Sequence, residues 1–99
     1  MRVRFGELAK DEIRDARAYL EQQQAGLGSQ FAAEISRSSD RIGRQPLLYP
    51  VEVGEVRKHV MNRFPYTMRY VVRSDIALVL AVSHHRRRPE YWIDRIELS

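Results

Sequence analysis

The sequence of 99 residues contains no cysteine, so it can form neither a disulfide, a thiol nucleophile nor a thiolate metal site. Long apolar runs are also missing. The longest, residues 76–82, falls far short of the roughly 20 residues that cross a membrane as a helix. The first residues, Met1–Phe5, lack the apolar stretch of a secretory signal peptide. We therefore expect a cytoplasmic protein with no membrane contact.

Motifs of several enzyme classes are absent as well. The chain has no glycine-rich phosphate loop, no G-x-S-x-G sequence and no paired-carboxylate motif. His84 and His85 are neighbours at the end of a predicted strand, so their side chains point to opposite faces and are poorly placed to share a metal ion. The sequence therefore predicts neither a metal site nor a cofactor.

Lysine is scarce although the chain is basic. Lys10 and Lys58 are the only lysines among 17 basic residues, and the formal net charge is +4. The remaining basic residues are arginines, whose planar guanidinium groups bind carboxylates and phosphates and stack on aromatic rings. A genome that favours arginine codons would produce the same bias, so the composition alone does not indicate a function.

The first half of the chain shows helical periodicity after a short strand around residues 3–5. Apolar residues recur at helical spacing in two stretches, each ended by a glycine, and charged residues such as Glu12 occupy the other face of the first. The two stripes are Ala9, Ile13, Ala16 and Leu20, then Leu27, Phe31, Ile35, Ser38 and Ile42. Because only a few residues separate the two predicted helices, they should form an antiparallel hairpin.

The second half shows strand periodicity after a predicted loop over residues 46–54. Strands are predicted over residues 56–61, 66–73 and 76–82. The second should be half-buried, whereas the third is apolar on both faces and should lie centrally in the sheet. The element order β-α-α-β-β-β indicates an α+β fold. A single domain over residues 1–99 would pack its helix hairpin on one face of a small antiparallel sheet.

A cluster of basic and aromatic side chains follows the last predicted strand. It comprises His84, His85, Arg86, Arg87, Arg88 and Tyr91. Fixed guanidinium groups beside aromatic rings suit phosphates, acidic chains or stacked bases. Trp92 is expected to pack over the core. Arg95 is expected to stack on Trp92, or to pair with Glu90 or with an acidic residue of the helices.

A second basic cluster is predicted on the outer face of the sheet. Arg57 and His59 share one face of their strand, and Arg69 of the next strand could lie beside them. Together with the residues after the last strand they would form a basic surface that includes groups able to transfer a proton. The alternative is a solvated strand face with ordinary salt bridges.

The order and spacing of these features resemble the RelE/ParE superfamily of toxins from bacterial type II toxin–antitoxin systems. The shared features, which extend over nearly the whole chain, are Pro46, Tyr49-Pro50, Arg57, Phe64-Pro65-Tyr66, the His/Arg run before Tyr91-Trp92, and Arg95. The Phe-Pro-Tyr element and the arginine-rich ending are more similar to the ParE branch, the plasmid stabilisation proteins. The resemblance implies a growth-inhibiting toxin neutralised by a cognate antitoxin. Such antitoxins usually pair a ribbon-helix-helix DNA-binding dimer with a disordered tail that folds onto the toxin.

The resemblance leaves the target open between DNA gyrase, for ParE-like members, and ribosome-bound messenger RNA, for RelE-like members. We expect a non-enzymatic toxin that binds gyrase. Residues expected to bind the target or the antitoxin are Arg57, Arg69, His84, His85, Arg86, Arg87, Arg88 and Tyr91.

The first alternative is an endoribonuclease. Its base would be Lys58 or His59 and its acid Tyr91 or His85, with Arg69 and Arg86 stabilising the phosphorane. An inactive relic that still binds its antitoxin is a further alternative. Whether the free chain forms a homodimer also stays open at this point.

Overall fold

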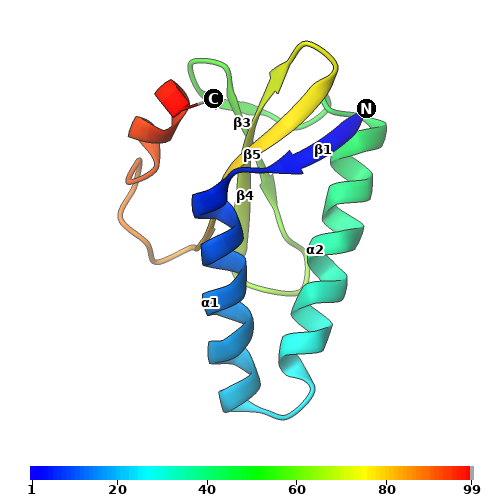
Figure 1. The fold of residues 1–99 in the computed structure, drawn as a ribbon, viewed down its shortest axis with the longest axis vertical. Helices are drawn as coiled ribbons and strands as arrows, with labels where there is room; N and C mark the ends of the chain where they lie inside the picture. The colour runs from blue at the N-terminus through cyan, green and yellow to red at the C-terminus, as the bar shows by residue number, and fades with distance from the viewer. Residues whose placement is uncertain (99) are drawn as a thin grey trace.

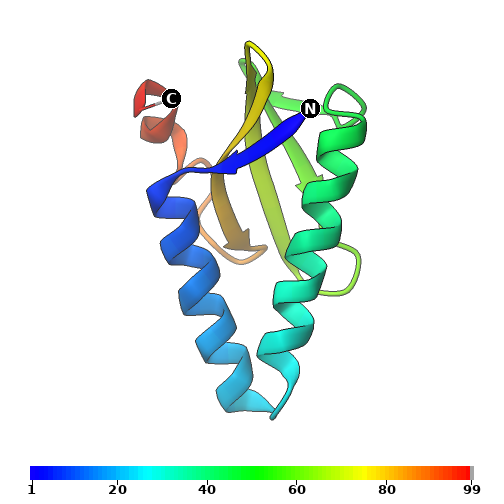
Figure 2. The same ribbon diagram turned by 45° about the vertical axis from the view of Figure 1, so that its right-hand side comes forward.

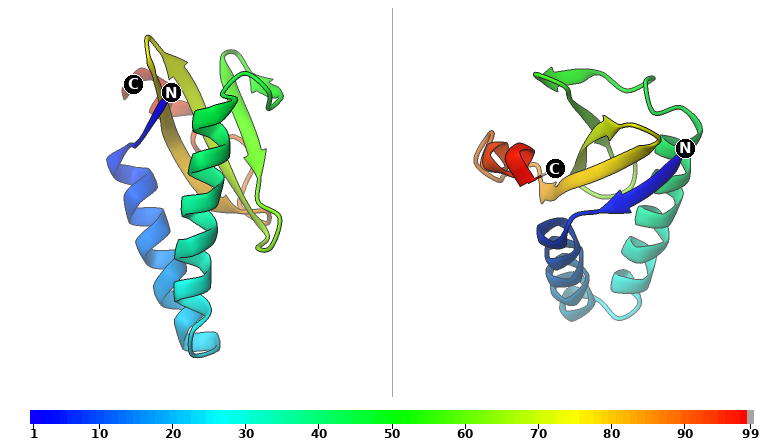
Figure 3. Two further views of the ribbon diagram at one scale, coloured as in Figure 1. Left: turned by 90° about the vertical axis from the view of Figure 1, so that its right-hand side faces the viewer. Right: turned by 45° about the horizontal axis from the view of Figure 1, so that its top comes forward.

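In the computed structural model, which describes residues 1–98, a helix hairpin covers one face of a five-stranded sheet (Figure 1). The elements are β1 Arg2–Phe5, α1 Glu7–Gln23, α2 Leu27–Arg44, β2 Val51–Val53, β3 Val56–Val60, β4 Tyr66–Arg73, β5 Ile76–His84 and the 3-10 helix η1 Ile93–Leu98. The helices extend well beyond the end of the sheet (Figure 3). The predicted α+β class and helix hairpin are confirmed.

The sheet has the order β1-β5-β4-β3-β2 and differs from the prediction in two respects. It is mixed rather than antiparallel, because β1 pairs with β5 in parallel, from Arg2 opposite Ile76 onwards. Parallel strands need a long crossover, which the chain from α1 to β4 supplies. In addition, part of the predicted loop forms β2, because the chain turns back after Val53 and pairs Val51 with Arg57 of β3.

Both helices bury the apolar stripes that predicted them. The buried residues are Ala9 and Ala16 in α1, and Gly28, Phe31, Glu34, Ile35, Ser38 and Ile42 in α2. The turn between the helices is held by Glu21, whose carboxylate accepts the N–H groups of Gly26 (3.0 Å) and Gly28 (2.9 Å). These two bonds hold the pKa of Glu21 below its usual value. Gly26 has a φ of 90°, which glycine adopts without a steric penalty.

The sheet carries an apolar cluster on each face. One lies between the sheet and the helices and includes Phe31 and Met68. On the opposite face, called the outer face below, Val56 and Val71 pack with Trp92, whose side chain is only 1% exposed. The predicted core position of Trp92 is thus confirmed. The prediction that β4 is half-buried is wrong, because the C-terminal segment covers the outer face as well. The same covering explains why β5 is apolar on both faces.

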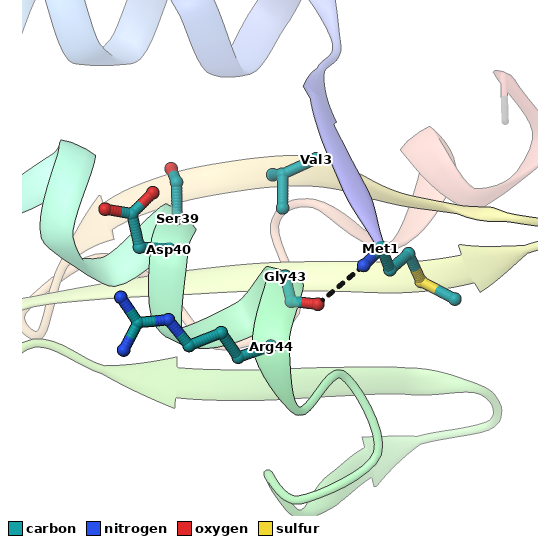
Figure 4. A pocket seen from close by; sticks show the side chains of 6 residues that line it. All are labelled: Met1, Val3, Ser39, Asp40, Gly43 and Arg44. Carbon is teal, nitrogen blue, oxygen red and sulfur yellow. Dashed lines mark hydrogen bonds between the residues drawn. The ribbon is translucent and has the colours of Figure 1, made fainter.

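The start of β1 approaches the end of α2 very closely (Figure 4). The N-terminal ammonium group of Met1 donates a hydrogen bond of 2.8 Å to the carbonyl oxygen of Gly43. A Cβ atom at Gly43 would lie 2.7 Å from the carbonyl oxygen of Met1, so only glycine permits this approach. Beside the contact is a cavity of about 630 Å³, lined also by Val3, Ser39, Asp40 and Arg44.

Candidate binding surface

A cationic pocket lies on the outer face, where β3, β4 and β5 meet the segment that follows β5. This segment, orange in Figure 2, turns back towards η1. The pocket, called the outer pocket below, has a volume of about 260 Å³. It is lined by Lys58, Val60, Thr67, Arg69, Ser83, His84, His85, Arg87, Arg88 and Pro89. None of these residues is acidic.

Strand pairing places the polar residues of the outer pocket on one face. Lys58 of β3 lies directly opposite Arg69 of β4, and Thr67 of β4 lies opposite Ser83 of β5. Side chains two residues apart in a strand share a face, so these four residues all point outwards. The hydroxyl-bearing residues Thr67 and Ser83 are almost fully buried, with exposed fractions of 5% and 6%. They form the polar floor of the outer pocket.

Arg69 is held in place by three different partners. Its Nε and Nη2 atoms donate to the two carboxylate oxygens of Glu52 at 2.7 and 3.3 Å, and its Nη1 atom donates to Ser83 Oγ at 3.3 Å. The guanidinium group lies 5.5 Å from the ring centre of Trp92. The bond from Arg69 also holds the pKa of Glu52 below its usual value. The charge of Arg69 is therefore compensated, and its role in binding stays a prediction.

The other cations of the outer pocket form no direct ion pair within residues 1–98, although Lys58 lies near enough to Glu52 to help lower the pKa of that carboxyl group. In the part of the chain that the structure describes, Lys58, Arg87 and Arg88 have no carboxylate within 4.0 Å. The guanidinium group of Arg87 stacks over the ring of Tyr91 at 4.2 Å, which limits its movement. Two hydrogen bonds to His84 fix the turn that begins the basic run: Arg86 N–H donates to His84 Nδ1, and Arg87 N–H donates to the His84 carbonyl oxygen, both at 3.0 Å.

The basic run does not form one continuous surface. His85 and Arg88 line the outer pocket, whereas Arg86 lines a separate side pocket of about 460 Å³ between α1 and the end of β5. Arg87 and His84 border both pockets. The side pocket also contains Glu12, Asp15, Ala16, Tyr66, Val82, Ser83 and Tyr91. Unlike the outer pocket, it therefore includes two carboxylates.

The predicted grouping of Arg57, His59 and Arg69 on the outer face is wrong. Arg57 and His59 point towards the helix side of β3, because the outer side at that end of the strand is taken by Val56 beneath Trp92. Arg57 donates hydrogen bonds of 3.2 and 2.8 Å to the carbonyl oxygens of Leu47 and Tyr49. It thus anchors the loop after α2 and lies outside the outer pocket.

His59 is buried beneath the loop after α2. Only 4% of the residue is exposed, and its ring meets that of Tyr49 edge to face at 4.5 Å. Burial lowers the pKa of His59, nearby Arg41 lowers it further, and Glu34 partly opposes this. The imidazole is therefore neutral at pH 7 and has no access to the outer pocket. Of the two bases considered for a nuclease, only Lys58 lines it.

Tyr91 belongs to a clasp that joins α1 to the C-terminal segment. The Glu12 carboxylate accepts hydrogen bonds from the Tyr91 hydroxyl and from both terminal nitrogens of Arg95, at 2.8 and 3.2 Å. It also accepts the N–H group of Val82 at 2.9 Å, while Arg95 donates to the Leu80 carbonyl oxygen at 3.0 Å. Burial, together with the bond to Glu12, raises the pKa of Tyr91.

Of the three partners considered for Arg95, the clasp shows the helix carboxylate. Glu12 itself was missed, because the sequence places it on the charged face of α1. Its place three residues after Ala9 and four before Ala16 puts it at the border of the two faces, and this spacing is the signal that could have identified it. Glu12 and Arg95 bond to backbone groups of β5, at Val82 and Leu80. Both residues lie beyond the end of β1, so within residues 1–98 this edge of β5 has no neighbouring strand there. The clasp therefore satisfies the backbone at this open edge.

Metal and membrane features are not found in the described residues. No group of three or more His, Cys, Asp or Glu side chains within residues 1–98 is arranged to hold a metal ion. No helix in this part of the chain is both long and apolar enough to cross a membrane.

The fold and the outer pocket define a small α+β domain that presents cations on the face of its sheet opposite the helices. Residues 3–89 match the model of the family described as "ParE toxin of type II toxin-antitoxin system, parDE". The chain therefore belongs to the ParE toxin family.

A solved structure of the chromosomal ParDE toxin–antitoxin system from P. aeruginosa has the same fold. Its TM-score is 0.63 at 12% sequence identity, over 85% of this chain and 95% of the other. No curated protein sequence matches the chain.

Proposed function

We propose that this ParE-family protein stops bacterial growth by binding DNA gyrase without catalysing a reaction, and that a cognate antitoxin neutralises it. The family assignment supports the target, since gyrase is the target associated with ParE-like toxins. The observation that carries the non-enzymatic part is the state of two of the four acid and base candidates. His59 is buried under the loop after α2, and the Tyr91 hydroxyl is bonded to Glu12. Neither is free to exchange a proton with a bound substrate.

The cations that form no ion pair with the described residues support the antitoxin partner. Lys58, Arg87 and Arg88 can receive the acidic side chains of a disordered segment that orders on binding. Such a segment would cover the same surface that the free toxin offers to its target. The expected antitoxin is a ribbon-helix-helix protein with a disordered tail.

A supercoiling assay with purified gyrase tests the proposal. The protein should inhibit supercoiling, and the variant K58Q/R87Q/R88Q should inhibit it less. A matched variant, R2Q/R4Q/R44Q, removes the same charge from exposed residues outside the outer pocket and should inhibit like the wild type. Unchanged supercoiling at saturating protein would contradict the proposal.

One observation favours endoribonuclease activity as the second candidate. Lys58 and His85 both line the outer pocket, so a base and an acid remain available there. Cleavage of messenger RNA after induction would then be expected, with a loss of orders of magnitude in K58A or H85A. Full toxicity of K58A, H85A and Y91F would exclude this candidate.

A further inference from the structure

The outer pocket has the composition of a site for one small anionic group. Its volume of about 260 Å³ lies just below the roughly 300–1,000 Å³ of pockets that enclose whole drug-sized ligands. Its lining includes no carboxylate, and Lys58, Arg87 and Arg88 have no carboxylate of residues 1–98 within 4.0 Å. A pocket of this size and charge fits one group of a larger molecule better than a free metabolite.

The floor of the outer pocket adds neutral hydrogen-bond donors to this charge. Thr67 and Ser83 face each other across β4 and β5, and both are nearly buried. Ser83 Oγ accepts a hydrogen bond from Arg69 and also bonds to the Tyr91 side chain, so its position is fixed, while the Thr67 hydroxyl group can donate to a ligand. In complexes of proteins with nucleic acids, the side chains that contact phosphate oxygens include Arg, Lys, Ser and Thr. The outer pocket combines the same types of side chain.

One feature of the rim favours a phosphodiester over a carboxylate, and another positions a cation for either anion. Val60, which is 49% exposed, and Pro89 both line the outer pocket and give it an apolar part against which a sugar edge could pack. Arg87 is stacked on Tyr91, so its guanidinium group is positioned before any ligand arrives. A carboxylate side chain would use the charge, but its one or two methylene groups offer less apolar surface to the rim than a sugar does.

We propose that the outer pocket binds a single phosphodiester group of a nucleic acid strand, contacted by Lys58, Arg87 and Arg88 around the hydroxyl groups of Thr67 and Ser83. The inference rests on the proposed function in one respect: gyrase holds DNA, so a toxin bound to it would meet DNA backbone. The contact itself needs no gyrase and can be measured alone.

Fluorescence anisotropy of a labelled 20-nucleotide single-stranded DNA, titrated with the purified protein at several salt concentrations, tests the inference. The logarithm of the binding constant should fall with the logarithm of salt concentration, by a slope of about 0.7 per phosphate contacted. K58Q/R87Q/R88Q should reduce this slope by about 0.7 or more, which corresponds to at least one lost phosphate contact. R2Q/R4Q/R44Q, with the same change in net charge, should leave the slope unchanged.

The floor of the outer pocket provides a charge-neutral test. T67V replaces one hydroxyl group by a methyl group of similar size, so it should weaken binding by about 3- to 10-fold through the lost hydrogen bond while the salt slope stays the same. A basic rim that merely attracts DNA would not respond to T67V. The inference would be overturned if the two triple variants reduced the salt slope equally, or if the wild-type protein did not bind DNA even at low salt.

Three comparisons separate the sources of the anion and the two proposals. If a matched RNA binds as tightly as DNA, the outer pocket recognises the phosphodiester group that both share. If the RNA binds more tightly, the pocket still binds a phosphodiester, and RNA is the natural ligand. A glutamate-rich peptide that binds at the outer pocket under conditions where DNA does not bind would overturn the phosphodiester in favour of a carboxylate. Gyrase inhibition without DNA binding refutes this inference alone, whereas DNA binding without inhibition refutes the proposed gyrase function alone.

Discussion

Replacing Glu12 by glutamine should destabilise the protein strongly, although Glu12 lies on a helix surface. Its carboxylate joins α1 to Val82, Tyr91 and Arg95, and the side chains of Glu12 and Arg95 are only 19% and 15% exposed. Removing one partner of a buried ion pair costs about 3–5 kcal/mol, because the other charge stays buried without compensation. Because some water reaches this pair, we expect about 3 kcal/mol for E12Q, towards the lower end of that range.

Thermal unfolding followed by circular dichroism measures this loss. Since a domain of this size loses about 4–8 °C in Tm per kcal/mol, E12Q should lower Tm by about 12–24 °C. Trp92 is the only tryptophan and packs next to the clasp, so its emission should shift to longer wavelength if the C-terminal segment loosens.

A matched control lies on the same helix. Asp11 pairs with Arg14 at 2.6 Å, but these side chains are 51% and 70% exposed. Exposed pairs contribute about 0–1 kcal/mol, so D11N should change Tm little. In a double-mutant cycle, E12Q and R95Q should couple by about 2 kcal/mol. If E12Q unfolds within a few degrees of D11N, the clasp does not stabilise the fold and the reasoning fails.

Three further predictions concern the core. Burial holds the pKa of His59 below the ordinary 6.5, so the unfolded chain takes up a proton first and stability should fall as pH drops below 6.5. Urea unfolding between about pH 8 and 5 should show a weaker pH dependence in H59L than in H85Q, and parallel curves would refute the assignment. W92A should cost about 3–5 kcal/mol in urea unfolding, and a loss below 1 kcal/mol would mean that the outer cluster contributes little. G43A should cost about 1–3 kcal/mol by forcing Met1 away from α2, and an unchanged Tm would contradict that steric account.

Local patterns predicted the helices and most strands because those patterns reflect local physics. The stripes of α1 and α2 face the core, although Ile13, Leu20 and Leu27 are only half-buried. Alternation identifies β4, and a continuous apolar run identifies β5. The parallel pairing of Arg2 with Ile76 has no such signal, because it joins segments far apart in the chain. Only the route taken by the whole chain determines it.

The candidate site was predicted in part, and its errors have one physical origin. Alternation in β3 separates Arg57 and His59 from Val56 correctly, yet it does not say which side faces solvent. The sequence interpretation assumed one covered face, whereas Trp92 covers part of the other. Consequently Lys58 lines the outer pocket with the arginines after β5, and His59 does not.

Thr67 and Ser83 could not have been identified as members of a site from the sequence. Isolated Ser and Thr residues in strands are common, and only the register of β4 against β5 brings these two together. Glu12 was missed for a similar reason, since its partner Arg95 lies 83 residues away. Both cases depend on tertiary contacts that leave little trace in the local pattern.

The most direct test of the central claim, that this ParE-family chain acts on gyrase, is pulse labelling after induction without antitoxin. Incorporation of labelled thymidine and of labelled methionine would be followed in parallel, for the wild type and for K58Q/R87Q/R88Q. The account predicts that thymidine incorporation falls first in the wild type and that the triple variant delays the fall. An earlier fall in methionine incorporation would contradict it and indicate cleavage of messenger RNA.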